Sequence, residues 1–188
     1  MTLKRRAAIA PNNRYNARRR EDCPSPICRR PIRYDRRVKN IDSAATPTAV
    51  AVLGYAGLIP FMGLALASSL EPVRGDLWHE LLRSYGAVIL SFVGALHWSV
   101  AMTSANLAER QRRGVFIWSV VPALLAWTAL CLHSVAAYAL LIAGFVLHYW
   151  RDLSLAAIAG LPAWYIPLRL RLSVVASISL AAGAISAC

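Results

Sequence analysis

The stretch VFIWSVVPALLAWTALCLHSVAAYALLIAGFVLHYW, residues 115–150, contains no Asp, Glu, Lys or Arg. As one straight helix it would extend about 54 Å, far longer than the roughly 30 Å hydrocarbon core of a bilayer. It must therefore fold back, and Leu132-His133-Ser134 is its only polar break. We expect two membrane-spanning helices here, over about residues 115–132 and 135–150, joined by a tight turn.

Three further apolar stretches are long enough to cross a bilayer. They cover about residues 48–70, 85–105 and 172–187, and Pro60 should kink the first of them because it removes one helical hydrogen bond. The apolar stretch 153–160 is too short to cross, so we expect an interfacial or re-entrant helix there. The sequence thus predicts an all-α polytopic membrane protein with five transmembrane helices in residues 46–188.

The charges of the chain are concentrated in its N-terminal tail. The chain carries a formal net charge of +12, and 13 of its 21 Lys and Arg residues lie before Asp42. Residues 1–45 lack apolar periodicity, so we expect a disordered basic tail. No recognition helix or interleaved aromatic residues accompany this charge, which argues against nucleic acid as a partner. A polybasic segment beside a membrane span is typical of binding to anionic lipid headgroups.

The distribution of basic residues also predicts an orientation. The tail and the loops around residues 106–113 and 151–171 are basic, whereas the loop around residues 71–83 and the turn at 132–134 are not. Under the positive-inside rule, the N-terminus is cytoplasmic and the C-terminus is periplasmic in a bacterial inner membrane. The first 20 residues contain no acid, so the mitochondrial inner membrane is the alternative.

His97 is an ionisable residue near the middle of the second predicted span. Helical geometry places it on one face with Gly86, Leu90, Val93, Ala101 and Ser104. Such a residue should face other helices and find a partner, for which Ser119 or a carbonyl group freed by a proline is a candidate. We favour a neutral histidine that joins helices by hydrogen bonds. The alternative is a role in proton transfer, metal binding or haem binding.

The same span carries small residues spaced four apart. These are Ala87, Ser91, Ala95, Ser99 and Thr103. Small residues in a row let another membrane helix approach closely and let hydroxyl groups bond across the interface. We therefore expect a helix-packing face along this series.

Other chemistry is sparse in the sequence. It contains no metalloprotease, serine-hydrolase or phosphate-loop motif. His148 should lie about 8 Å from His97 in depth, which disfavours a bis-histidine haem. For Asp152, we favour an interfacial ion pair with its neighbour Arg151 over a catalytic dyad with His148. We expect no enzymatic activity, no cofactor, no metal site and no catalytic residue.

Several strings in the predicted spans resemble a known family. They are LGYAGLIPF (53–61), YGAVILSFVGALHW (85–98), WSVVPALLAW (118–127), GFVLHYWRD (144–152) and GLPAWYIPLRLRLS (160–173). They are similar to small bacterial inner-membrane proteins known as domain of unknown function 3429, and to the animal transmembrane protein 69 family. The resemblance covers about residues 48–187 and implies a polytopic membrane fold and possible mitochondrial relatives, but no activity.

Three functions remain open on this basis, and an enzyme that acts on lipid is the third of them. The first is a non-enzymatic accessory or assembly protein that packs against other membrane helices, either a partner protein or another copy of the chain. The alternative is a small oligomeric transporter or channel that uses His97. Stable foreign subunits after gentle detergent extraction would favour the first.

Overall fold

The computed structural model describes residues 46–132 and 135–187, and every regular element in them is helical. The helices are α2 (Thr48–Ala56), α3 (Ile59–Leu70), the short 3₁₀ helix η2 (Pro72–Arg74), α4 (Gly75–Thr103), α5 (Glu109–Cys131), α6 (Val135–Ala159) and α7 (Tyr165–Ser186). Counting α2 and α3 together, five helical segments are long and apolar enough to cross a membrane. The prediction of an all-α, five-span protein is confirmed. The predictions for the tail 1–45 and the turn residues 133–134 lie outside the described residues.

The first span is broken as Pro60 predicts. α2 ends at Ala56 and α3 begins at Ile59, which places Pro60 in the first turn of α3, where a missing backbone N–H leaves no hydrogen bond unmade. The Tyr85 hydroxyl donates a hydrogen bond of 2.8 Å to the carbonyl of Gly57 at the break. This contact satisfies a carbonyl group that the interrupted helix leaves free.

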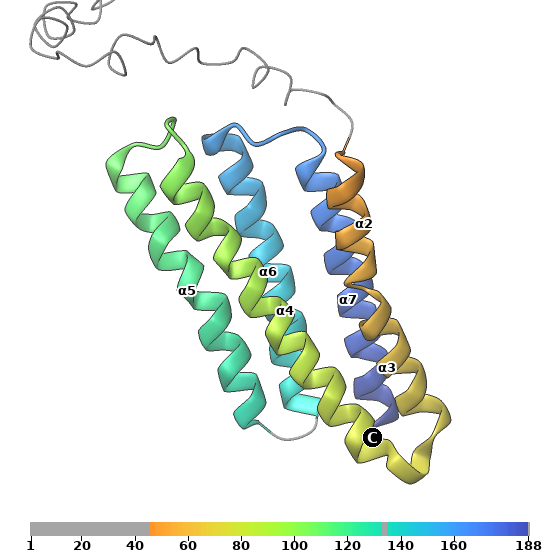
Figure 1. Cartoon of the computed structure of the whole chain (residues 1–188). Coiled ribbons are helices and arrows are strands. Elements are labelled where there is room, and N and C mark those ends of the chain that lie inside the picture. Colours follow the sequence, from red (N-terminus) through yellow and green to blue (C-terminus); the bar gives the residue numbers. More distant parts are fainter. Residues whose placement is uncertain (1–45, 133–134, 188) are drawn as a thin grey trace, which may run out of the picture. The chain divides into compact units, whose positions relative to one another are not determined.

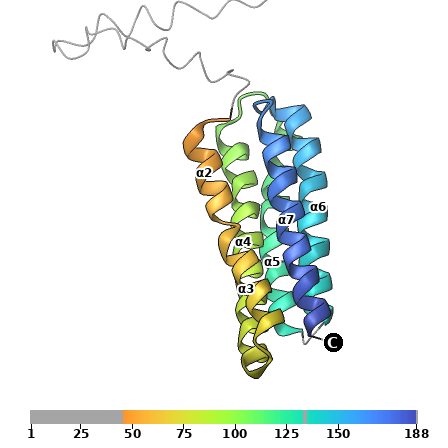
Figure 2. The same ribbon diagram turned by 90° about the vertical axis from the view of Figure 1, so that its right-hand side faces the viewer.

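α4 lies at the centre of the helical bundle. It packs most extensively against α5 and also contacts α3, α6 and α7 (Figures 1 and 2). The start of α2 and the end of α7 lie at opposite ends of the bundle (Figure 1), as an odd number of crossings requires. α4 and α5 approach closely at Gly94, where an added Cβ would lie 2.9 Å from the Ser119 carbonyl oxygen and 3.1 Å from the Pro122 ring.

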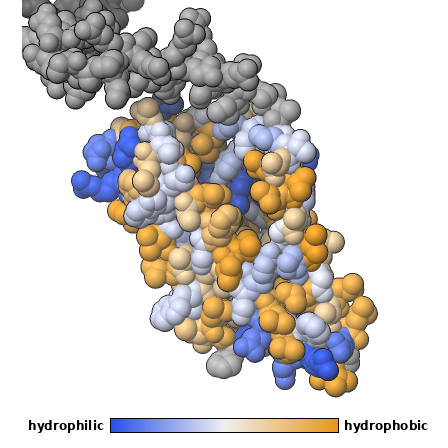
Figure 3. Space-filling model, viewed as in Figure 1, coloured by the Kyte–Doolittle hydropathy of each residue, from blue (hydrophilic) through white to orange (hydrophobic). Residues whose placement is uncertain are grey.

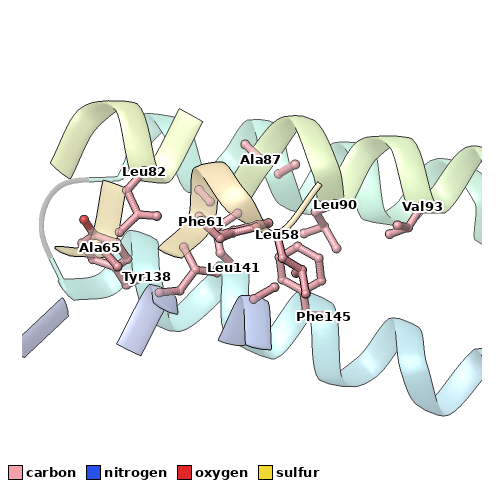
Figure 4. Close-up of a cluster of buried hydrophobic side chains, with 14 residues drawn as sticks. Leu58, Phe61, Ala65, Leu82, Ala87, Leu90, Val93, Tyr138, Leu141 and Phe145 are labelled. Atoms are coloured by element: carbon pink, nitrogen blue, oxygen red, sulfur yellow. The ribbon is translucent and has the colours of Figure 1, made fainter. Parts of the chain in front are cut away.

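The larger apolar core lies in the half of the bundle that contains the end of α7. Large side chains from α3, α4 and α6 interlock there, among them Phe61, Leu90, Leu141 and Phe145 (Figure 4). Phe61 stacks edge-on against Phe145, with ring centroids 6.1 Å apart. On the face seen in Figure 3, hydrophobic residues are spread between strongly hydrophilic patches near the two ends, and many large hydrophobic side chains of the helices are exposed, as in a protein surrounded by lipid.

α5 begins at Glu109 rather than near residue 115, and three other predicted boundaries are wrong as well. α4 begins at Gly75 rather than near residue 85, because the mixed polar and apolar residues 76–83 extend the helix past the uniformly apolar segment. α6 runs through Ala159, so residues 153–159 continue the span instead of forming an interfacial or re-entrant helix. Leu155 and Ala159 are buried in a second apolar cluster with Ala101 and Val115, and Gly160, with φ of 67°, ends the helix.

The last wrong boundary is the start of α7 at Tyr165, seven residues before the predicted start of the last span. Pro167 is the reason for the error. The sequence around it suggests a chain break, yet a proline in the first turn of a helix removes no helical hydrogen bond. The earlier start brings Tyr165 and Arg169 into the bundle.

Candidate functional site: a buried histidine and carboxylate cluster

Five polar residues from three helices meet inside the bundle. α4 contributes His97, α6 contributes His148 and Asp152, and α7 contributes Tyr165 and Arg169. His97 and His148 are each 1% exposed and Asp152 is 0% exposed. Ionisable side chains at this depth of a membrane protein are rare, and they mark functional sites by default.

Asp152 is the residue on which the other four converge. Its Oδ2 accepts a hydrogen bond of 2.7 Å from Arg169 Nε, and its Oδ1 accepts one of 3.1 Å from the Tyr165 hydroxyl. The Nε2 atoms of His97 and His148 lie 3.7 and 3.8 Å from the same Oδ1. Asp152 and Arg169 thus form a buried ion pair across α6 and α7, which offsets the cost of placing either charge in the bundle.

The two histidines touch each other directly. Their ring centroids are 4.6 Å apart, with an interplanar angle of 60°. The predicted depth offset of about 8 Å is wrong, because it assumes an end of α6 that lies well before Ala159. Direct ring contact leaves no space for a porphyrin between the imidazoles, so the geometry still disfavours a bis-histidine haem.

Within the described part of the chain the ring nitrogens of both histidines make no hydrogen bond of ordinary length and angle, and His148 has only a weak contact with the Val93 backbone. Ser119, the partner predicted for His97, instead donates its hydroxyl to the Phe116 carbonyl at 2.7 Å. Within the described residues, His97 therefore makes no interhelical hydrogen bond with Ser119. Gly86, Leu90, Val93 and Ala101 of the predicted face are all buried with His97, whereas Ser104 lies just past the end of α4 and is half-buried.

Arg151 does not pair with Asp152. Its guanidinium carbon lies 4.9 Å from the centroid of the Trp118 ring, a cation–π geometry. The ion pair favoured from the sequence is thus replaced by the pair between Asp152 and Arg169. Neighbours in a helix sequence point about 100° apart, whereas Arg169 approaches Asp152 from the facing helix.

The small residues of α4 do not share one surface. Ala87 is buried and Ser91 is half-buried, whereas Ala95, Ser99 and Thr103 are exposed. Ser91 and Thr103 donate their hydroxyls to carbonyl groups of their own helix. Residues spaced four apart rotate by about 40° per step, so the series starts inside the bundle and leaves it.

A polar recess of approximately 840 Å³ lies at the opposite end of the bundle from the start of α2. Its lining includes Asp76, His79, Glu80, Arg83 and Tyr138. Within it, His79 Nδ1 lies 3.0 Å from the Tyr138 hydroxyl. The recess is open and lies outside the buried cluster.

The fold and the cluster define a polytopic helical membrane protein with a closed ionisable site. The chain belongs to the family described as Protein of unknown function (DUF3429), whose model matches residues 46–185. It is also 36% identical, over 156 residues, to Transmembrane protein 69 of Xenopus tropicalis. That alignment covers 79% of this chain and 57% of the frog protein, so the chain matches little more than half of its relative's length. No solved structure matches the chain.

These comparisons confirm the resemblance seen in the sequence. The cluster itself is only partly visible there. The sequence singles out His97, but it gives no reason to join His148 and Asp152 to it, and it places Tyr165 and Arg169 in a loop. The available signal is the spacing of His148 and Asp152, four residues apart, which puts both on one face of a helix.

Proposed function

We propose that this protein is a non-enzymatic accessory or assembly protein that packs against other membrane helices. The observation that carries the proposal is the first half of the first span. None of the nine residues of α2 is buried, and Leu53 is 74% exposed. α2 contacts mainly α7, where Gly54 faces Leu172. Half a span thus remains free for a partner, which is another membrane protein or a second copy of the chain.

The closed interior supports an accessory role over a conduit. α4 and α5 approach to van der Waals contact at Gly94, and α4, α6 and α7 enclose the polar cluster so that His97 and His148 are 1% exposed. A transport path needs polar groups that reach water from both sides. The exposed residues Ala95, Ser99 and Thr103 offer a second surface where a helix can approach closely.

Site-specific cross-linking in the native membrane tests this proposal. A photo-reactive amino acid at position 53 of α2 should form one discrete cross-linked product with a protein. The ratio of partner to chain in that product should be constant. The same probe at position 124 of α5, where Leu124 is 58% exposed, should give only lipid adducts. Lipid adducts alone at both positions would contradict the proposal, because lipid then covers α2 as it covers α5.

The second candidate function is a small oligomeric transporter or channel that uses His97. The buried cluster favours it, since a histidine beside a carboxylate inside a membrane suits a proton or cation pathway. The path would have to form between copies of the chain. Flux of protons or metal ions into proteoliposomes, lost in His97→Gln, would favour this function, and a tight foreign complex without flux would favour the first.

We also propose an orientation and a location. Arg110, Arg112 and Arg113 lie in the first turns of α5, at the end of the bundle where α2 begins (Figure 1). The positive-inside rule then supports a cytoplasmic N-terminus in a bacterial inner membrane, or the matrix side of a mitochondrial inner membrane. The basic tail would bind anionic headgroups on that side.

A further inference from the structure

The ring nitrogens of His97 and His148 are buried and make no hydrogen bond of ordinary length and angle within the described residues, although His148 has a weak contact with the Val93 backbone. A neutral imidazole has one donor and one acceptor, and a buried group left unpaired costs about 1–3 kcal/mol. Two adjacent histidines in this state are unusual, because most buried polar side chains have a partner. Their nitrogens thus require something that the protein's own hydrogen bonds do not supply.

The geometry of these nitrogens points to one shared ligand. His97, His148 and Asp152 each offer one ligand atom, and these three atoms lie within 4.8 Å of one another. The two Nε2 atoms are 3.7 and 3.8 Å from Asp152 Oδ1. Ligand atoms held about 2.1 Å from a tetrahedral metal ion are about 3.4 Å apart. Modest side-chain movements would therefore close the set around one ion.

We propose that His97, His148 and Asp152 bind a divalent first-row transition metal ion, with zinc and ferrous iron as the closest matches. Two imidazoles and one carboxylate are the protein ligands of catalytic zinc sites and of non-haem iron(II) sites. Magnesium and calcium prefer all-oxygen ligands, which makes them a poorer fit. The inference does not depend on the partner interaction proposed above.

Arg169 and Tyr165 form the outer layer of this site. Arg169 holds Oδ2 of Asp152 at 2.7 Å, which turns the other carboxylate oxygen toward the histidines. Tyr165 donates to that Oδ1 from 3.1 Å. Hydrogen bonds of this kind orient metal ligands and tune the affinity of metal sites. A dication beside the neutral Asp152–Arg169 pair leaves the site positively charged, so the open coordination position favours an anionic ligand such as hydroxide.

The full-length chain, purified in detergent and stripped with a chelator, provides the test. We expect one equivalent of Co²⁺ or Zn²⁺ to bind, and Co²⁺ to produce the ligand-field absorption bands of a nitrogen- and oxygen-ligated ion. His97→Gln and His148→Gln should each weaken binding by about tenfold or more, because even second-layer changes cost roughly that much. Metal should also raise the melting temperature of the unmodified chain, since a ligand stabilises the state that binds it.

His79→Gln is the matched control, because His79 is a histidine of the same chain that lies in the open recess. It should retain the bands, the stoichiometry and the metal-dependent melting shift. Equal metal content and equal spectra in the unmodified chain, His97→Gln and His148→Gln would overturn the proposal and indicate surface binding. Absence of any ligand-field band in the folded protein would overturn it as well, leaving a bound water molecule as the occupant.

Tyr165→Phe separates the site from general folding. The hydroxyl donates to the carboxylate of Asp152 and also lies close to the Arg169 side chain. The variant should fold, keep one equivalent of metal and shift both the affinity and the cobalt spectrum. An unchanged spectrum with weakened binding in the two histidine variants would place the metal away from Asp152 Oδ1 and overturn the three-residue ligand set.

Discussion

Asp152 on α6 and Arg169 on α7 are joined across the helix interface by a hydrogen bond of 2.7 Å between Oδ2 and Nε, with Asp152 fully buried. The pair ties the C-terminal half of α6 to the first turns of α7. It also fixes which carboxylate oxygen faces His97 and His148. The stability of the bundle and the shape of the candidate site thus depend on one contact.

Asp152→Asn should destabilise the protein strongly. The amide keeps the size of the side chain but leaves the Arg169 charge buried and uncompensated, which typically costs about 3–5 kcal/mol. Thermal unfolding in a fixed detergent measures the effect. Arg171→Gln is the control, because Arg171 is an exposed residue two positions further along the same helix, and its melting temperature should stay near that of the unmodified chain.

The double variant Asp152→Asn, Arg169→Gln gives the same prediction a second test. Removing both charges removes the uncompensated one, so much of the lost stability should return. If the double variant melts as low as the sum of the two single changes, the ion pair does not act as a unit in the bundle.

Gly94→Ala should loosen the contact between α4 and α5. The added Cβ would meet the Ser119 carbonyl at 2.9 Å and the Pro122 ring at 3.1 Å, and neither a backbone atom nor a proline ring can rotate away. Overpacking of this kind costs about 1–3 kcal/mol. Gly63→Ala on α3 has no atom within 4 Å of the new Cβ and should be neutral or stabilising by up to about 1 kcal/mol. Equal melting temperatures for the two variants would show that the interface at Gly94 accepts a methyl group without strain.

The number of spans and the face of His97 could be predicted because they depend on local rules. Span length follows from bilayer thickness, and the buried face of His97 follows from the helical period. The residues that surround His97 in the cluster could not be predicted, since they come from α6 and α7, and the predicted end of α6 and start of α7 are wrong. Residues 153–159 look too short to cross a membrane by themselves, although they continue α6, and Pro167 resembles a break, although it lies in the first turn of α7.

The packing series on α4 shows a different limit. Ala87, Ser91, Ala95, Ser99 and Thr103 look equivalent in sequence, but four steps of about 40° turn the series through about 160°. The buried face instead follows the mixed three- and four-residue spacing of Gly86, Leu90, Val93, His97 and Ala101. The exposed members Ala95, Ser99 and Thr103 remain a prediction for close contact with another membrane helix.

Reporter fusions should place the two ends of the described chain on opposite sides of the membrane. A phosphatase fused after Ser186 should be active and one fused after Asn106 inactive, because Asn106 lies in the loop between α4 and α5 at the end where α2 begins. A fluorescent reporter that folds only in the cytoplasm should give the reverse pattern. Phosphatase activity at position 106 and none after Ser186 would reject the orientation while leaving the five spans intact.

The last prediction concerns His97 and His148 as a pair. If each histidine only packs between helices, the effects of His97→Gln and His148→Gln on stability should be nearly additive. The contact between the two rings should cause only a small departure from additivity. If both serve one ligand, either substitution should abolish the cellular function, and the double variant should be no worse than the single ones. The amide side chain retains hydrogen-bonding capacity and much of the volume, so melting temperatures should fall little in either case. The measurement is a complementation assay beside thermal unfolding for the three variants. Additive loss of function, in step with loss of stability, would show that the histidines hold the helices together and do no more.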